Sequence, residues 1–197
     1  MSEIPALRTT SEDGQQPEPD EQRVEDAAPE TQQHAPGGLE VPRGYKVVTG
    51  SSSGDGRAVG VVVAKFNGDI TSRLLQTAIE ELEQAGVDRE AVTIVPVPGA
   101  FELPLAAMAL AKTRRYACIV ALGCVIRGET PHFDYVAGEA ASGLQLAGIE
   151  TGVPVAFGVL TTDTLEQAEA RIDRAADAVR SALEMADVFQ QVRTAAK

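Results

Sequence analysis

A single histidine stands in the stretch VIRGETPHFDYV, residues 125–136, where an apolar run gives way to a helical pattern. His132 is one of only two histidines in the 197-residue chain. It follows a Gly-Glu-Thr turn at a predicted helix start, and helix starts bind anions because unpaired N–H donors and the helix dipole both favour negative charge. A histidine beside an anion can transfer protons near neutral pH. The pattern predicts such a site, with a histidine that only caps or packs the helix as the equal alternative.

Three neighbours of His132 have side chains or backbone groups that could also contact an anion. Thr130 offers a hydroxyl donor, or else caps the following helix. Glu129 would bring negative charge to a phosphate, so its backbone N–H is the expected contact. Arg127 pairs either with a phosphate or with a surface carboxylate in a structural ion pair. The turn lacks the lysine and the length of a Walker-type loop, and no G-x-G-x-x-G follows the first apolar run, so a nucleotide site has no support.

Two phenylalanines follow apolar runs in a chain that has five Phe, three Tyr and no Trp. An aromatic residue at a strand end usually belongs to the core, but this core is built from aliphatic residues. Phe66 and Phe101 therefore favour a flat ring stacked between them. Cys124 lies within an apolar run, where a thiol is buried and inert. No Ser-His-Asp arrangement is present, and neither Cys118, Cys124 nor His132 has metal-ligand spacing.

The elements that must position these residues alternate along the chain. Buried strands are predicted for RAVGVVVAKF, AVTIVPV, YACIVALGCVI and PVAFGVLTT, and helices for ITSRLLQTAIEELEQAG, AFELPLAAMALAKTR, FDYVAGEAASGLQLAGI and TLEQAEARIDRAADAVRSALEMADVF. This order predicts right-handed βαβ crossovers and a mostly parallel sheet covered on both faces. Ligands of such sheets bind at the carboxyl ends of the strands, where the phenylalanines and the His132 turn should meet. KVVTG, residues 46–50, is compatible with one extra strand.

Charge and composition exclude several classes of function. Residues 1–45 hold ten Asp or Glu against three Arg, so they carry −7 of the net charge of −12. These residues predict a disordered acidic tail, and residues 46–197 an α/β domain. The lack of a basic stripe argues against nucleic-acid binding. No apolar run could span a bilayer and no signal peptide is evident, and two unpaired cysteines fit a reducing cytoplasm.

Five segments of the chain resemble the lumazine synthase family in order and spacing. They are VVVAKFNGDIT, VPGAFELPLAA, ALGCVIRGETPHFDYV, GVPVAFGVLTTDTLEQA and ALEMA. The resemblance implies a flavodoxin-like three-layer sandwich with a four-stranded parallel sheet flanked by helices on both faces. It also implies condensation of 5-amino-6-(D-ribitylamino)uracil with 3,4-dihydroxy-2-butanone 4-phosphate, with loss of phosphate and water. No metal or redox cofactor is implied, because the substrate amine itself attacks the ketone.

The resemblance also implies roles for individual residues. Phe66 would stack on the pyrimidine ring, and His132 would transfer protons. The remaining contacts would come from Ala100, Phe101 and Glu102 to the ring and ribityl chain, from the backbone of Cys124, Val125 and Ile126 to the pyrimidine, from Glu129, Thr130 and Arg171 to the phosphate, and from Phe157 of a neighbouring subunit. The implied assembly is a homopentamer, with an icosahedral shell built from pentamers as the larger form, and riboflavin synthase is a candidate partner. The Ala- and Gly-rich helix 135–149 would allow helices of neighbouring subunits to pack closely in the pentamer.

The end of the chain departs from the family pattern. The family's Gly-rich turn ending in Asn-Lys-Gly is missing, and RIDRAADAVRSALEMA contains neither Gly nor Pro. A continuous apolar stripe predicts one long helix from about Thr164 to Val188, where relatives have two. The loss removes the family's lysine near the phosphate. Two alternative functions follow: a shell-forming or flavin- or lumazine-binding member with weakened catalysis, and a flavodoxin-like electron carrier.

Overall fold

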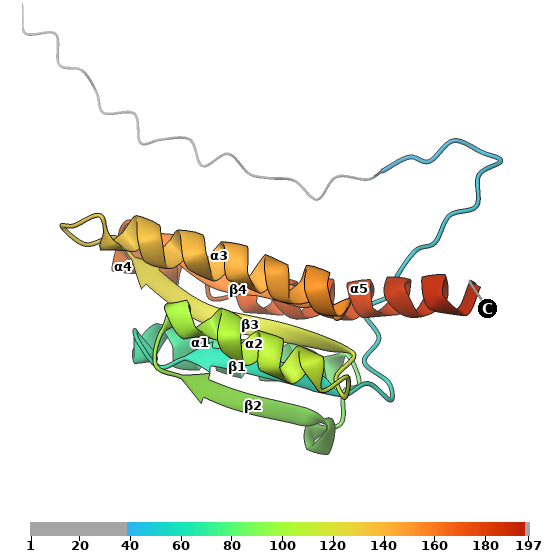
Figure 1. Ribbon diagram of the computed structural model, residues 1–197, viewed down its shortest axis with the longest axis horizontal. Helices are drawn as coiled ribbons and strands as arrows, with labels where there is room; N and C mark the ends of the chain where they lie inside the picture. The colour runs from blue at the N-terminus through green and yellow to red at the C-terminus, as the bar shows by residue number, and fades with distance from the viewer. Residues whose placement is uncertain (1–38, 196–197) are drawn as a thin grey trace, which may run out of the picture. The chain divides into compact units, whose positions relative to one another are not determined.

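Four parallel strands form the centre of the structure (Figure 1). They are β1 (Val59–Ala64), β2 (Val92–Val97), β3 (Cys118–Ile126) and β4 (Val155–Thr162), arranged in the order β2-β1-β3-β4. Every residue of β1 and the first seven residues of β3 are buried, because these two strands are central and covered on both faces. The parallel sheet predicted from the sequence is therefore confirmed.

The computed structural model describes residues 39–195. Most of the predicted acidic tail, including His34, lies outside these residues. Residues from Arg43 onward belong to the same unit as the sheet. Within the described part of the chain, the helices are too short or too polar to cross a membrane.

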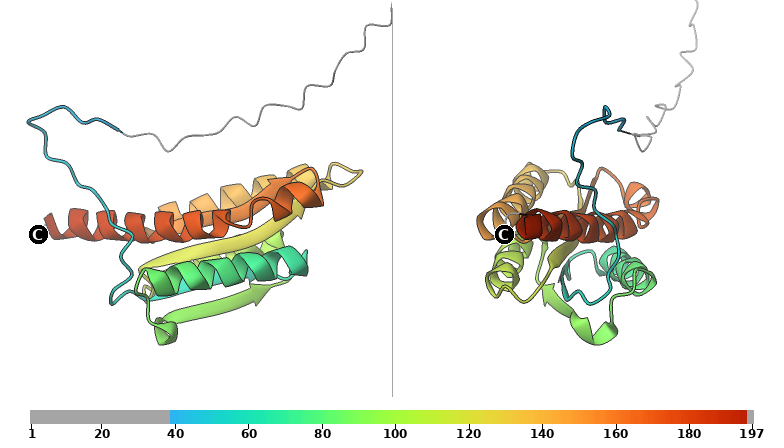
Figure 2. Two further views of the ribbon diagram at one scale, coloured as in Figure 1. Left: turned by 180° about the vertical axis from the view of Figure 1, so that it is seen from behind. Right: turned by 90° about the vertical axis from the view of Figure 1, so that its right-hand side faces the viewer.

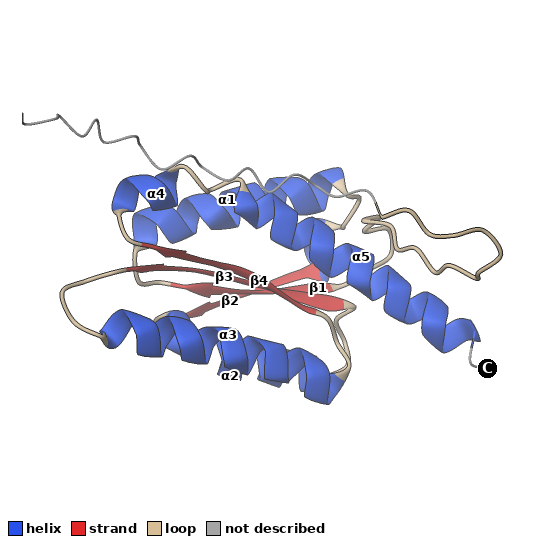
Figure 3. Ribbon diagram, turned by 90° about the horizontal axis from the view of Figure 1, so that it is seen from above, coloured by secondary structure: helices blue, strands red, loops and turns tan. Residues whose placement is uncertain are grey.

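Helices cover the sheet in two layers, which completes the predicted three-layer sandwich (Figure 3). On one face lie α1 (Gly68–Gln84), α4 (Leu165–Glu169) and α5 (Arg174–Ala195); on the other lie α2 (Leu103–Lys112) and α3 (His132–Thr151). Two short 3-10 turns, η1 (Arg89–Ala91) and η2 (Ala100–Glu102), flank β2. Side chains alternate along the strands, so Val61 and Val63 join the core under α1 and α5, while Val62 and Ala64 join the core under α2 and α3.

Residues 46–50 do not form the extra strand that their composition allowed. They run as irregular chain beside α5, and side chains of α5 bond to the backbone at Thr49 and at the next residue but one, Ser51. Gln191 Nε2 donates to the carbonyl oxygen of Thr49 at 2.8 Å, and the backbone N–H of Ser51 donates to Asp187 Oδ2 at 3.0 Å. Arg57 also pairs with Asp187, at 2.8 Å. Helix side chains thus replace the ladder partners that a strand would need.

The single long helix predicted from Thr164 to Val188 is wrong. The chain turns at residues 170–173, and α5 then continues to Ala195. The N–H of Arg171 donates to the carbonyl of Ala168 at 3.0 Å and that of Arg174 to Arg171 at 3.1 Å, so short three-residue turns replace the helix without Gly or Pro. The turn directs α5 back along the sheet, where it lies beside α1 (Figure 2).

Both cysteines are buried in the core under α1 and α5, and neither forms a disulfide. Burial raises the pKa of the Cys118 thiol to about 12, and Arg57 opposes part of this shift. Burial raises the pKa of the Cys124 thiol to about 11. The thiols therefore stay protonated at neutral pH, as predicted for an inert Cys124.

We expect Gly50→Ala to lower the free energy of unfolding by about 1–3 kcal/mol. A Cβ at Gly50 would overlap the carbonyl oxygen of Glu184 and lie 2.9 Å from Val188 Cγ2, so the segment could no longer pack on α5. Gly68→Ala is the matched control, because a Cβ there meets no atom within 4 Å. Urea denaturation measures both variants, and equal stabilities would contradict the close packing.

The buried thiols predict a loss of stability in alkali. Their folded-state pKa values exceed the ordinary value of 9.0, so the unfolded chain releases these protons first as the pH rises. The contribution of the two protonated thiols to the free energy of unfolding is complete below pH 9.0 and is lost as the pH approaches about 11 to 12. Between pH 8 and 10, Cys118→Ala should lose about 1 kcal/mol less unfolding free energy than the unmodified protein. Equal losses in urea titrations would refute this assignment.

Candidate active site

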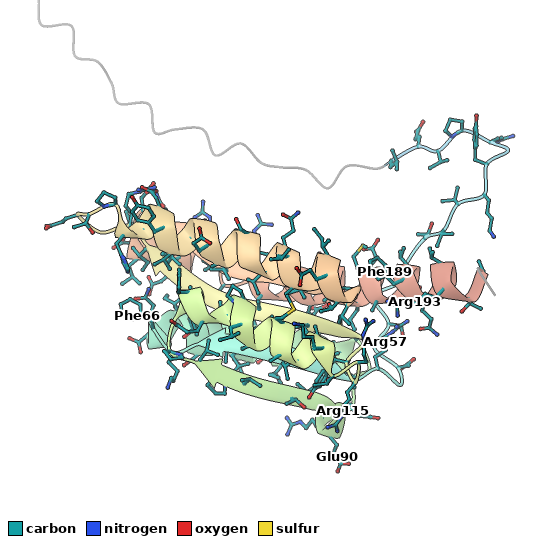
Figure 4. The ribbon with its side chains drawn as sticks, viewed as in Figure 1. Arg57, Phe66, Glu90, Arg115, Phe189 and Arg193 are labelled. Carbon is teal, nitrogen blue, oxygen red and sulfur yellow. The ribbon has the colours of Figure 1, made fainter. Side chains whose placement is uncertain are left out.

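Three loops meet at the carboxyl ends of β1, β2 and β3. Ala64 and Val97 are register partners, so β1 and β2 end at the same level. Beyond them, the N–H of Lys65 donates to the carbonyl of Val97 at 2.8 Å, and that of Phe66 donates to Pro98 at 3.1 Å. Phe66 lies at this end of the sheet, opposite the end with Arg57 (Figure 4). The pairing thus brings two predicted ligand-side loops together.

Asn67 connects the Phe66 loop to β3. Its backbone is left-handed (φ 55°), a conformation that Asn tolerates better than most residues, and it precedes the first residue of α1. The side-chain Nδ2 donates to the carbonyl oxygen of Cys124 at 2.9 Å. The sequence placed Asn67 at the end of the first strand but assigned it no role, although an Asn between a strand end and a helix start is a recognisable signal for such a turn. The carbonyl of Cys124 is therefore already engaged within the protein.

The predicted ring-binding aromatics are exposed at this edge. The Phe66 residue is 70% exposed and Phe101 is 56% exposed, so neither belongs to the core. Gly99 lies between the two loops: a Cβ built on it would be 3.3 Å from Glu102 Oε2 and 4.0 Å from Phe66 Cβ. Phe66 and Glu102 therefore flank the same glycine. A flat ring could rest on Phe66 with polar groups near Glu102.

The loop after β2 holds Glu102 in a defined orientation. The backbone N–H of Gly99 donates to Glu102 Oε2 at 2.9 Å, and Ala100 is buried beneath the loop. Within residues 39–195, Glu102 Oε1 has no hydrogen-bond partner, so this oxygen is free to accept from a ligand hydroxyl. At the end of β3, Val125 and Ile126 are half-buried beside this edge.

His132 is the first residue of α3 and is exposed to solvent. The helix has Pro131 at its N-cap position and no side-chain cap, so Thr130 does not cap it and His132 does not pack in the core. Across the described residues, the side chains of Glu129, Thr130 and His132 form no hydrogen bond to protein groups. The turn and α4 lie at the same end of the sheet as the tip of β3 (Figure 1). The His132 turn is thus open to a ligand at the predicted edge.

Arg127 forms structural ion pairs rather than standing free for a phosphate. Nε donates to Asp163 Oδ1 at 2.9 Å and Nη1 donates to Asp134 Oδ1 at 3.1 Å. The guanidinium carbon lies 4.0 Å from the centroid of the Phe133 ring. Hydrogen bonding to Asp163, and then to Asp134, raises the pKa of Arg127 above its ordinary value. Of the two readings of this residue, the structure supports the ion pair.

Phe157 and Arg171 do not belong to the loops after β1, β2 and β3: one lies within β4 and the other in the turn after α4. Phe157 pairs with Ala121 in the sheet and stands five residues before the end of β4, which corresponds to about 16 Å along the strand. Within one subunit it does not join the edge where Phe66 lies. Arg171 lies in the turn after α4, beyond the end of β4, and its Nη1 donates to the carbonyl of Gln167 at 2.8 Å.

Comparison with known proteins agrees with this geometry. The family model described as 6,7-dimethyl-8-ribityllumazine synthase matches residues 56–190, which include each of the segments around the candidate site. A protein named 6,7-dimethyl-8-ribityllumazine synthase from Syntrophus aciditrophicus (strain SB) is 45% identical over 151 residues, covering 74% of this chain and 98% of the relative. With sheet order, loop positions and sequence similarity in agreement, the chain belongs to the 6,7-dimethyl-8-ribityllumazine synthase family.

Proposed function

We propose that this protein is a 6,7-dimethyl-8-ribityllumazine synthase of riboflavin biosynthesis. It condenses 5-amino-6-(D-ribitylamino)uracil with 3,4-dihydroxy-2-butanone 4-phosphate and releases phosphate and water. The observation that carries this proposal is that three features lie at the same end of the sheet (Figure 1): an exposed Phe66, Glu102 with one carboxylate oxygen bonded to the N–H of Gly99, and the exposed turn before α3. Two small molecules can be held side by side there.

The pyrimidine substrate occupies the β1 and β2 side of the edge. Its ring stacks on Phe66, and the loop Ala100–Glu102 holds the ring and the ribityl chain. Glu102 Oε1 suits a polyol, because each ribityl hydroxyl can donate a hydrogen bond to a carboxylate. The backbone at the end of β3, from Cys124 to Ile126, contacts the pyrimidine edge. The carbonyl of Cys124 already accepts from Asn67, so Val125 and Ile126 provide the remaining backbone groups.

The phosphate-bearing substrate occupies the start of α3. The backbone of Glu129 and the hydroxyl of Thr130 receive the phosphate, since no side chain within residues 39–195 caps this helix start. Arg171 lies beyond the end of β4, where its Nη1 donates to the carbonyl of Gln167. To bind the phosphate, the guanidinium exchanges this hydrogen bond for one to a phosphate oxygen. In this proposal His132, the first residue of α3, is shared by the anion contacts and the pyrimidine side. Both substrates therefore meet beside one imidazole.

The chemistry requires proton transfer and alignment rather than a protein nucleophile. The primary amine of the pyrimidine attacks the ketone to give an imine with loss of one water. A proton is then removed from the neighbouring carbon as the phosphate leaves with its bonding electron pair, and the enol formed becomes a second ketone. The ribityl-bearing nitrogen attacks this ketone and closes the ring with loss of a second water. The two thiols cannot take part, because burial keeps them protonated. His132 carries protons between the reacting groups, a role that contributes about 100- to 10,000-fold in rate. Alignment of two substrates can lower a barrier by about 7 to 11 kcal/mol.

Assembly completes the site in this proposal. Phe157 is 46% exposed on the edge strand β4 and lies far from its own His132 turn, so it lines the site of a neighbouring subunit. Nearby apolar side chains, Ile149 and Met185, are 72% and 43% exposed and would be covered by the neighbour. The assembly is a homopentamer in the cytoplasm, with an icosahedral shell as the larger form. The acidic composition of residues 1–45 suits a solvated tail, and riboflavin synthase is the candidate partner.

Purified protein mixed with the two substrates should produce the fluorescence of the ribityl-lumazine. His132→Ala should lower kcat by about 100-fold or more, because the reaction loses its acid–base group. His34→Ala is the matched control, since it removes the other histidine, and should leave kcat unchanged. Binding of the ribityl substrate without any turnover would contradict the proposal and support a binding protein instead.

A mixing experiment tests whether sites are shared between subunits. His132→Ala and Phe157→Asp subunits should each be nearly inactive as homo-oligomers. Co-expressed in equal amounts, they should recover roughly a quarter of the full activity, because random neighbours leave that fraction of shared sites intact. Activity no greater than the sum of the two separate variants would show that Phe157 serves no neighbouring site.

A further inference from the structure

We infer that Arg127 is a positioning residue that holds the His132 turn by joining the start of α3 to the connection after β4. This inference rests on the proposed function, because the turn carries the groups that receive the phosphate and transfer protons. The backbone N–H of Arg127 donates to the carbonyl of Thr162 at 2.9 Å, which fixes its own position at the last pair of the β3–β4 ladder. Its side chain then reaches forward to α3.

The guanidinium contacts two elements at once. Asp134 belongs to the first turn of α3, while Asp163 follows the last residue of β4. One nitrogen of Arg127 donates to each carboxylate, and the ring of Phe133 lies against the planar cation at 4.0 Å. A rigid fork with donors on several sides can make these contacts together, whereas the single ammonium of lysine cannot. The beginning of α3 is thereby tied to the sheet.

The rest of the turn has few attachments of its own. Across residues 39–195, the side chains of Glu129, Thr130 and His132 form no hydrogen bond, and α3 begins without a side-chain cap. The N–H of Asp134 bonds only locally, to the carbonyl of Pro131 at 3.0 Å. The position of His132 therefore depends on its neighbours in the chain, and Arg127 contacts the two residues that follow it, Phe133 and Asp134.

Arg127 also sets the charge beside the phosphate. Without the guanidinium, the carboxylates of Asp134 and Asp163 would stand uncompensated beside the turn, and their negative charge would repel a phosphate. Exposed ion pairs contribute little to folding, and the Arg127 side chain is 45% exposed. Its loss should therefore act on the site much more than on the fold.

The test compares Arg127→Ala with Arg180→Ala. Arg180 is the matched control: its side chain is 47% exposed, and it also joins two carboxylates, Glu81 and Asp177, from different helices. In Arg127→Ala we expect kcat to fall about 10- to 100-fold, since misplacement by about 1 Å can cost that much. The KM for the butanone phosphate should rise about tenfold, while the KM for the pyrimidine stays within about twofold. Arg180→Ala should change neither constant.

A second measurement separates this inference from the proposed function. Equilibrium dialysis with inorganic phosphate needs no turnover, and Arg127→Ala should bind phosphate about tenfold more weakly than the unmodified protein. Unchanged kinetics and phosphate affinity would refute the role of Arg127 while the proposed function stands. An equal loss in Arg180→Ala, or equal rises in both KM values, would also refute it, because general destabilisation would explain the effect.

Two remaining outcomes are also decisive. If Arg127→Ala does not fold, Asp163→Asn replaces it, since this variant removes the shorter ion pair. It should lower kcat by loosening the turn, while the KM for the butanone phosphate should not rise, because a negative charge beside the turn is lost as well. An unchanged kcat in Asp163→Asn would then refute the role. If the unmodified protein neither condenses the substrates nor binds phosphate, both the proposed function and the positioning role fail.

Discussion

The parallel pairing of β1 with both β2 and β3 is the constraint on which the site depends. Because β1 and β2 pair from Val59 with Val92 to Ala64 with Val97, the loops after these strands start at the same level. The bond from Asn67 to the carbonyl of Cys124 then extends this alignment to β3. A shift of one residue in either pairing would turn each side chain to the opposite face and move Phe66 away from Glu102. Backbone register thus sets the geometry of the candidate ligand-binding side chains.

Polar contacts orient the side chains that lie beyond the ends of the buried strands. The core ends near the tips of the strands, and beyond it the chain is exposed. Side chains there bond to backbone groups or to each other: Glu102 to the N–H of Gly99, Asn67 to β3, and Arg127 to two aspartates. Each such contact contributes little to folding because water competes for the same groups. Their value lies in limiting the orientations of exposed side chains that must meet a ligand.

The corrected elements show where periodicity stops being informative. Ala168, Ile172 and Ala175 keep helical spacing, and all three contact the same core, so the pattern gives no sign that the helix breaks between them. Short three-residue turns keep side chains on one side of the chain almost as a helix does. Whether the helix continues or breaks here therefore depends on where the chain must reverse after β4. For KVVTG, the apolar pattern suited a strand, but the carboxylate and amide of Asp187 and Gln191 supplied nearer partners for the backbone of this region.

Local periodicity and residue types were enough to predict the alternation of strands and helices, the buried thiols and the position of His132 at a helix start. It also identified Phe66 and Phe101 as aromatics outside an aliphatic core. The pairing of Arg127 with Asp134 and Asp163 could be seen only in the folded chain, since Asp163 lies 36 residues away in sequence. Strand register likewise placed Phe157 away from the end of the sheet where Phe66 lies. Contacts between distant segments depend on how the elements pack, and no local pattern records that packing.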